Sequence, residues 1–179
     1  MLELKRHVVD VPDFPRPGIL FRDITPLLRN MFAPTIDALE KLLDTQEWRG
    51  IDAVAGIESR GFILGGAVAD RLGAGFVPIR KEGRLPSKRI SQSYSLEYGE
   101  AVVEIHADAI ARGQRVLIVD DLLATGGTAA AAAALVDQLG GDIAGFAFLV
   151  ELSDLGGSTA LGGRPYTALL RMNTNGGIE

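Results

Sequence analysis

The residues whose types and spacing suggest chemistry most clearly lie in the segment 116–128. Residues 116–119 (Val-Leu-Ile-Val) form an uninterrupted aliphatic run, which is typical of a buried parallel strand. Two adjacent acids, Asp120 and Asp121, follow where that strand should end. After a short apolar spacer, residues 125–128 read Thr-Gly-Gly-Thr, which predicts a tight turn.

The turn is suited to binding a phosphate, whereas the two acids are not, because carboxylates carry the same negative charge as a phosphate. A glycine-rich turn that enters a helix, expected here over 128–138, presents unpaired backbone N–H groups and the positive end of the helix dipole. The hydroxyls of Thr125 and Thr128 add donors. Two carboxylates beside such a turn suit the neutral hydroxyls of a ribose, or a cation, so the segment predicts a sugar-phosphate site. The alternative is a buried strand with an incidental polar turn; acidic pairs also end strands in ATPases and phosphate-accepting signalling domains.

A second loop of similar design precedes another predicted helix. Ser59 and Arg60 follow a short predicted strand, and Gly61 permits unusual backbone angles where the helix starts. The planar guanidinium of Arg60 could pair two phosphate oxygens. Taken alone, Arg60 would be a surface residue in a capping turn; beside the first motif, we favour pyrophosphate binding.

Residues 81–97 lack a clear periodicity, and we expect them to form a long loop or hairpin. A basic run lies in and next to this segment, and two interpretations are compatible with it: a solvated loop, or a mobile cover that neutralises a leaving pyrophosphate. The run contains one acid, Glu82, and the cations Arg80, Lys81, Arg84, Lys88 and Arg89.

Two further residues acquire a meaning only beside these motifs. Glu97 lies between Leu96 and Tyr98, where a partly apolar setting would raise its pKa and allow it to transfer a proton to a heterocycle. An isolated glutamate is otherwise simply solvated. Phe21 could stack on a purine if a base-binding site lay nearby.

Composition places these motifs in one ordinary globular unit. The chain has 179 residues, of which 47% are hydrophobic and 23% charged, so we expect a single domain over 1–179. The net charge of −5 argues against non-specific nucleic-acid binding. Cysteine is absent, and neither a signal segment nor a membrane-spanning run is apparent. We therefore expect a cytoplasmic protein without membrane or nucleic-acid partners.

Alternating strands and helices predict an α/β fold, with a mostly parallel central sheet flanked by helices. Residues 173–179 are expected to be a disordered tail. Helices are predicted over 2–10, 34–44, 61–72 and 128–138, and strands over 52–57, 75–79, 101–105, 116–119, 143–150 and 166–171.

The segment 120–128 resembles the 5-phosphoribosyl-1-pyrophosphate (PRPP) signature of the type I phosphoribosyltransferases. Four further segments, in order along the chain, are similar to those of the adenine phosphoribosyltransferase family. They are Phe14-Pro15-x-Pro17-Gly18-Ile19-Leu20-Phe21-Arg22-Asp23-Ile24, Glu58-Ser59-Arg60-Gly61-Phe62, Ile79-Arg80-Lys81 and Ser93-Tyr94-Ser95-Leu96-Glu97-Tyr98-Gly99.

The resemblance implies the type I phosphoribosyltransferase fold, with a flexible hood formed by about 81–98, and a homodimer. It implies a purine-salvage reaction that converts adenine and PRPP to AMP and pyrophosphate, with Mg²⁺ on the PRPP. The chain carries Arg84 where a lysine is expected in the hood, which keeps the charge.

The resemblance also implies a role for each matching residue. Backbone groups of Leu20 and Arg22 would contact adenine, Phe21 would stack on it, and Glu97 would be the catalytic acid. Asp120 and Asp121 would hold the ribose hydroxyls, with the metal nearby. The 5-phosphate would be bound by Ala124, Thr125, Gly126, Gly127 and Thr128, and pyrophosphate by Ser59, Arg60, Arg80, Lys81 and Arg84.

Two other functions fit the same motifs. One is transfer to another purine, xanthine or hypoxanthine. The other is a non-catalytic regulator that only senses PRPP; such proteins usually carry an added basic DNA-binding segment.

Overall fold

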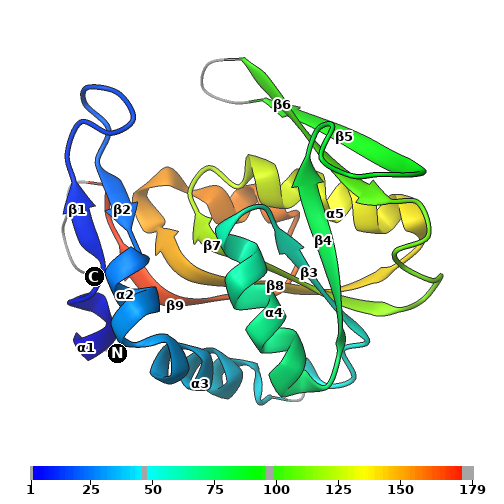
Figure 1. The fold of residues 1–179 in the computed structure, drawn as a ribbon, viewed down its shortest axis with the longest axis horizontal. Helices are drawn as coiled ribbons and strands as arrows, with labels where there is room; N and C mark the ends of the chain where they lie inside the picture. The colour runs from blue at the N-terminus through cyan, green and yellow to red at the C-terminus, as the bar shows by residue number, and fades with distance from the viewer. Residues whose placement is uncertain (1, 46–47, 96–98, 175–179) are drawn as a thin grey trace.

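The computed structural model describes residues 2–45, 48–95 and 99–174. Within them, one large sheet forms the centre of the molecule (Figure 1). In spatial order its strands are β5 (Arg89–Ser95), β6 (Glu100–His106), β4 (Gly75–Lys81), β3 (Ala53–Ile57), β7 (Arg115–Leu123), β8 (Asp142–Leu152) and β9 (Tyr166–Met172).

Most of this sheet is parallel. The strands β4, β3, β7, β8 and β9 run in the same direction, whereas β6 pairs antiparallel with both β4 and β5. The connection from β3 to β4 contains a helix, as does the connection from β7 to β8, and these two helices cover the sheet. The predicted α/β class with a mostly parallel sheet is therefore confirmed.

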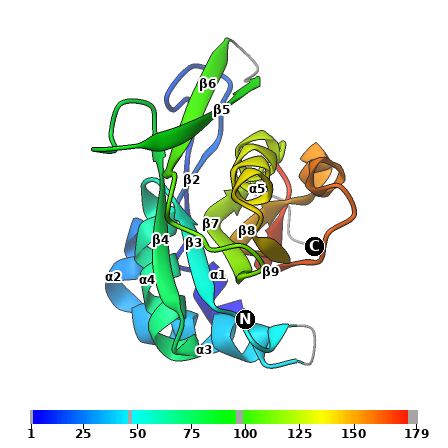
Figure 2. The same ribbon diagram turned by 90° about the vertical axis from the view of Figure 1, so that its right-hand side faces the viewer.

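Helices lie on both faces of the sheet, as Figures 1 and 2 show from two directions. On one face are α2, α3 and α4, and α5 covers the other, next to two short 3₁₀ helices that follow β8. The helices are α1 (Leu2–Lys5), α2 (Thr25–Asn30), α3 (Phe32–Leu43), α4 (Arg60–Leu72) and α5 (Gly127–Leu139), with η2 (Ser153–Leu155) and η3 (Gly157–Leu161).

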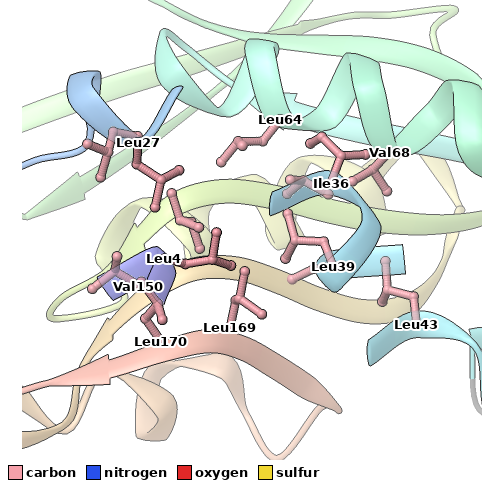
Figure 3. Packing of buried hydrophobic residues seen from close by; sticks show 14 of the residues in the cluster. Leu4, Leu27, Ile36, Leu39, Leu43, Leu64, Val68, Val150, Leu169 and Leu170 are labelled. Carbon is pink, nitrogen blue, oxygen red and sulfur yellow. The ribbon is translucent and has the colours of Figure 1, made fainter. Parts of the chain in front are cut away.

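The sheet separates two hydrophobic cores. Alternate residues of β7 point to opposite faces, so Leu117 and Val119 join the core beneath α3 and α4, while Val116 and Ile118 join the core beneath α5. Figure 3 shows the first core, where leucines of α3 meet the sheet. In the second core α5 packs through its alanines, whose small size lets this helix lie close to the strands.

Two antiparallel hairpins extend beyond the parallel strands of the sheet at the same end. One pairs β1 (Val9–Val11) with β2 (Phe21–Asp23), and the other pairs β5 with β6 along the whole of β5. Figures 1 and 2 both place these hairpins beyond the end at which the parallel strands finish. The segment 81–97, expected to be a loop or hairpin, thus contains one complete strand of a hairpin.

The predicted helix over 2–10 is wrong. Helix α1 ends at Lys5, and Val9–Val11 is a strand, because this valine-rich stretch pairs with β2. Neither β2 nor α2 was expected. The strand predicted over 116–119 continues to Leu123, which places both acids inside it. The other predicted helices and strands are present, with ends that differ by a few residues.

None of the described helices is long and apolar enough to cross a membrane. At the start of the expected tail, Thr174 donates through its backbone N–H to Asp154, and the carbonyl of Asn173 accepts from Arg22. Residues 175–179 lie outside the described part of the chain.

Candidate active site

The acidic pair occupies the last part of β7. Asp121 is buried and Asp120 half-buried, since β3 and β8 flank this strand on either side. One oxygen of Asp120 accepts a hydrogen bond of 2.9 Å from the backbone N–H of Asp121. Two carboxylates are therefore held close together where little water can reach them.

Arg60 supplies the charge that balances this pair. Its Nε lies 2.8 Å from Oδ2 of Asp121, and the side chain is 31% exposed. The guanidinium carbon also lies 5.1 Å from the centre of the Phe21 ring, within cation–π range. Arg60 thus connects the acids predicted to hold a ribose with the aromatic ring predicted to stack on a base.

Burial changes the ionisation of both acids. It raises the pKa of Asp120 well above the ordinary value, and the charge of neighbouring Asp121 raises it further. Burial also raises the pKa of Asp121, although the positive charge of Arg60 acts in the opposite direction. Both carboxylates therefore release their protons less readily than exposed ones, and a ligand that replaces lost water contacts would favour their charged forms.

Gly61 has a packing role that its sequence context did not reveal. Its backbone angles are not in the left-handed region; instead, a Cβ at this position would lie 2.8 Å from the carbonyl oxygen of Val119 and 2.9 Å from Oδ1 of Asp120. The start of α4 can approach the end of β7 this closely because Gly61 lacks a side chain. This approach brings Arg60 to Asp121.

The Thr-Gly-Gly-Thr turn leads directly into α5, as predicted. Gly126 precedes the helix with φ of +82°, a left-handed angle that favours glycine. Among the described residues, no side chain caps this helix start. The first N–H groups of α5 therefore remain available to an anion. The turn also packs closely against the 3₁₀ segment: a Cβ on Gly157 would lie 2.0 Å from the carbonyl oxygen of Ala124.

Two cavities at this end of the sheet share a wall. The smaller, about 220 Å³, is lined by Arg60 and the continuous segment 120–129. The larger, about 500 Å³, is lined by residues 18–22 together with Leu122, Ala124, Leu152, Leu155 and Thr174. Because Leu122 and Ala124 line both, a molecule with a phosphorylated sugar in the first could place an attached base in the second.

The residues predicted to bind a base thus line the larger cavity. Phe21 also makes an edge-to-face contact with Phe14, with ring centres 5.1 Å apart. The side chain of Arg22 is buried, donates to the carboxylate of Asp10 and to the carbonyl oxygen of Asn173, and so ties β2 to β1 and to the C-terminal segment. Any contact between Arg22 and a base therefore has to come from its backbone.

The cations predicted to bind pyrophosphate have different surroundings. Ser59 and Arg60 line a further cavity of about 570 Å³ beside Phe21. Arg80 is held by Glu58, whose two oxygens lie 3.3 Å from its Nε and 3.2 Å from a terminal nitrogen. Burial alone would raise the pKa of Glu58, but hydrogen bonds from Arg80 and from the backbone of Lys81 lower it below the ordinary value. Lys81 and Arg84 are exposed.

Glu97 lies outside the described residues. Strand β5, which precedes Glu97, ends beside the Thr-Gly-Gly-Thr turn of residues 125–128, which we call the phosphate turn. A Cβ on Gly127 would lie 3.4 Å from the carbonyl oxygen of Ser95 and 3.5 Å from the Tyr94 ring. The chain therefore enters the segment that contains Glu97 beside the start of α5.

Sequence reasoning missed the acids that hold the cations in position. Glu58 was quoted only as part of a motif, and neither Asp10 nor Glu104 was singled out. Their partners are distant in sequence, which leaves no local pattern to find. A carboxylate within or next to an otherwise aliphatic strand was the available signal for Glu58 and Glu104.

Fold and site together define a class. A mostly parallel sheet with an acidic pair at a strand end, directly before a phosphate turn, is the arrangement of a phosphoribosyltransferase. The phosphoribosyl transferase domain model matches residues 27–158, and the chain belongs to this family.

Within that family, the chain is a member of the adenine phosphoribosyltransferases. It is 56% identical to the adenine phosphoribosyltransferase of Cereibacter sphaeroides over 158 residues, which cover 88% of each chain. The crystal structure of the Rhodothermus marinus adenine phosphoribosyltransferase is 49% identical, with a TM-score of 0.89 over 96% of this chain and 97% of that one. The Saccharomyces cerevisiae enzyme, solved with an imino-altritol bisphosphate and adenine, is 43% identical, with a TM-score of 0.87 over 94% and 97%.

The close approach at Gly61 can be tested within one helix. We expect Gly61→Ala to destabilise the protein by about 1–3 kcal/mol, because the new methyl group would collide with the end of β7. Gly66→Ala is the matched control, since a Cβ there meets no described atom within 4 Å. It should stabilise α4 by up to about 1 kcal/mol. Urea unfolding measures both changes, and equal effects of the two substitutions would contradict the steric explanation.

We expect the acidic pair to lower the free energy of unfolding at neutral pH, because both carboxylates have raised pKa values in the folded protein. A folded-state pKa raised above the unfolded value means that stability falls as the pH rises from the ordinary aspartate range towards the folded pKa. At neutral pH we therefore expect Asp120→Asn to melt at a higher temperature than the unaltered protein while losing most activity. Its amide oxygen can still accept from the N–H of Asp121.

Asp137→Asn is the control for this substitution, because Asp137 is an exposed acid of α5 that pairs with Arg164. It should change neither property appreciably. A lower melting temperature for Asp120→Asn at neutral pH would show that the buried pair is not a source of strain.

Proposed function

We propose that this protein transfers the 5-phosphoribosyl group of PRPP to adenine in a purine-salvage reaction, forming AMP and pyrophosphate. One observation carries the proposal: the phosphate turn and acidic pair line one cavity, residues 18–22 line another, and the two share Leu122 and Ala124. The named relatives support the same substrate class, including the yeast enzyme solved with adenine.

The reaction breaks the bond between C1 of the ribose and a pyrophosphate oxygen, and it forms a bond from C1 to a ring nitrogen of adenine. The proton that the imidazole ring of adenine loses passes to Glu97. Positive charge develops on the ribose and negative charge on the pyrophosphate. We assign Arg60, Arg80, Lys81 and Arg84, with Ser59, to the leaving group, since fixed cations stabilise charge as it develops. Asp120 and Asp121 orient the ribose through its hydroxyls, and residues 124–128 hold its 5-phosphate.

The donor set at the end of β7 fits Mg²⁺. Asp120 and Asp121 offer carboxylate oxygens, the ligands that Mg²⁺ prefers, next to a turn that can hold a phosphate. Among the described residues, no group of three or more acidic, histidine or cysteine side chains could hold a metal ion, so Mg²⁺ would be held on the phosphates of PRPP next to these two carboxylates. When bound with PRPP, Mg²⁺ neutralises phosphate charge.

We also propose that the protein is a homodimer. Ile63 of α4 and Phe76 of β4 are 47% and 39% exposed, and the Phe76 ring lies 5.9 Å from that of Phe62. These residues form an apolar surface beside the pyrophosphate loop, where a second copy could cover them. The cytoplasmic location stays a prediction.

Base selection provides the direct test of the proposed function. Adenine carries an exocyclic amine where hypoxanthine carries a carbonyl oxygen, so backbone acceptors near Leu20 and Arg22 would accept from the first and repel the second. We expect kcat/KM for adenine to exceed that for hypoxanthine, guanine or xanthine by about four orders of magnitude. Equal use of hypoxanthine would identify a different purine enzyme, and no nucleotide product with any of the four bases would favour a PRPP sensor.

Glu97→Gln belongs to the same test. We expect this variant to bind adenine normally and to turn over slowly, because the amide cannot exchange a proton with the base. A fully active Glu97→Gln variant would contradict the proton-transfer role of Glu97 while leaving the substrate assignment intact.

A further inference from the structure

A buried carboxylate lies in the middle of β6, in the hairpin that β5 and β6 form. The side chain of Glu104, on β6, is 3% exposed. In the register of the sheet it stands opposite Arg80 of β4 and Ser91 of β5. A charged side chain this deeply buried is uncommon unless it is fully paired.

Glu104 accepts three hydrogen bonds within the hood. One oxygen accepts from Nε of Arg89 at 2.9 Å and from the hydroxyl of Ser91 at 3.1 Å. The other accepts from the backbone N–H of Gly83 at 3.0 Å. Burial alone would raise the pKa of Glu104, but these hydrogen bonds lower it below the ordinary value, so the carboxylate is charged at neutral pH.

The contact with Gly83 fixes the turn that connects β4 with β5. Gly83 has φ of +74°, so the chain reverses direction at the residue that Glu104 holds. A second contact holds the same turn, because Arg80 donates to the carbonyl oxygen of Arg84 at 3.0 Å. Leu85 is buried, which anchors the turn on its apolar side.

This turn begins at one of the cations assigned to pyrophosphate and carries another. Lys81 directly precedes it and Arg84 lies within it, both exposed to solvent. Among the ion pairs of the described residues, none involves the side chain of Lys81 or Arg84. Lys81 is the last residue of β4, and its backbone N–H donates to Glu58 at 3.0 Å, so the turn determines the placement of Arg84. The turn itself is held by Glu104 on one side and by Arg80 on the other.

We propose that Glu104 is a positioning residue for pyrophosphate, which holds the 82–88 turn so that Arg84 faces the leaving group. This inference rests on the proposed function. A role limited to stability is the competing explanation. The bonds to Arg89 and Ser91 join β6 to β5, whereas the bond to Gly83 reaches the turn. The bond to the Gly83 backbone is the one that can transmit position.

The test compares Glu104→Gln with a matched buried carboxylate. In Glu104→Gln one acceptor oxygen becomes an NH₂ group that faces a donor, so the hold on the turn weakens without a change in size. Glu151→Gln is the control: Glu151 is 6% exposed and accepts from Arg171 and Tyr166, each at 3.0 Å, outside the hood. For each variant we would measure the inhibition constant of pyrophosphate, KM for PRPP, KM for adenine and the melting temperature.

For Glu104→Gln we expect the pyrophosphate inhibition constant and KM for PRPP to rise roughly tenfold, as for a lost hydrogen bond to a charged group, with KM for adenine unchanged. Glu151→Gln should lower the melting temperature by a similar amount and change none of these constants. Unchanged pyrophosphate inhibition in Glu104→Gln would overturn the inference. So would a parallel rise in KM for adenine, or an equal rise in Glu151→Gln, since either result indicates general loosening.

A second variant covers the case in which Glu104→Gln does not fold. Ser91→Ala removes one donor but leaves the carboxylate and its bond to Gly83 in place, so it should fold and shift pyrophosphate inhibition less than Glu104→Gln, in the same direction. No shift in Ser91→Ala would then overturn the inference. Direct titration with Mg²⁺-pyrophosphate reads the effect without turnover. If the unaltered protein formed no AMP, the proposed function would fail, whereas the titration would still test Glu104.

Discussion

Burial of two neighbouring carboxylates at the end of a central strand is the constraint on which the rest of the site depends. Asp120 and Asp121 lose water and repel each other, so the fold has to bring a cation to them. Arg60 does this across the gap between β7 and α4, and Gly61 makes the approach possible by leaving no side chain in the way. The same guanidinium lies over the ring of Phe21, so this contact also links the acids to β2.

Pairing of a carboxylate with an arginine recurs around the site. Glu58 holds Arg80, and Glu104 holds Arg89 together with the backbone of Gly83. Asp10 holds Arg22 on the side of the base cavity. The pair of Glu58 and Arg80 links the end of β3 to β4, whereas the pairs of Asp10 and Glu104 each join the two strands of one hairpin. The phosphate turn is different: glycine, not charge, shapes it, and Gly126 and Gly157 allow it to pack against the 3₁₀ segment.

The sequence was sufficient for the parts of the molecule that are encoded locally. The aliphatic run before Asp120, the Thr-Gly-Gly-Thr turn and the periodicity of α3 each predict a structure within one short window, and the structure contains all three. The error over 2–10 arose because Val9–Val11 becomes a strand only by pairing with β2. The anchoring roles of Glu58, Glu104 and Asp10 could not be predicted, since they depend on contacts between separate strands and loops. The packing reason for Gly61 was hidden in the same way, because the atoms that require a glycine belong to β7.

The proposed function requires the turn at the start of α5 to hold the 5-phosphate beside the cavity lined by residues 18–22. Calorimetric titration of the unaltered protein with AMP and with adenosine tests this requirement most directly. The two ligands share base and ribose and differ only in the phosphate. The account predicts that AMP binds roughly a hundredfold more tightly, the ratio expected when about two hydrogen bonds to a charged group are lost. Equal affinities would contradict it, because they would show that the phosphate makes no contact with the turn.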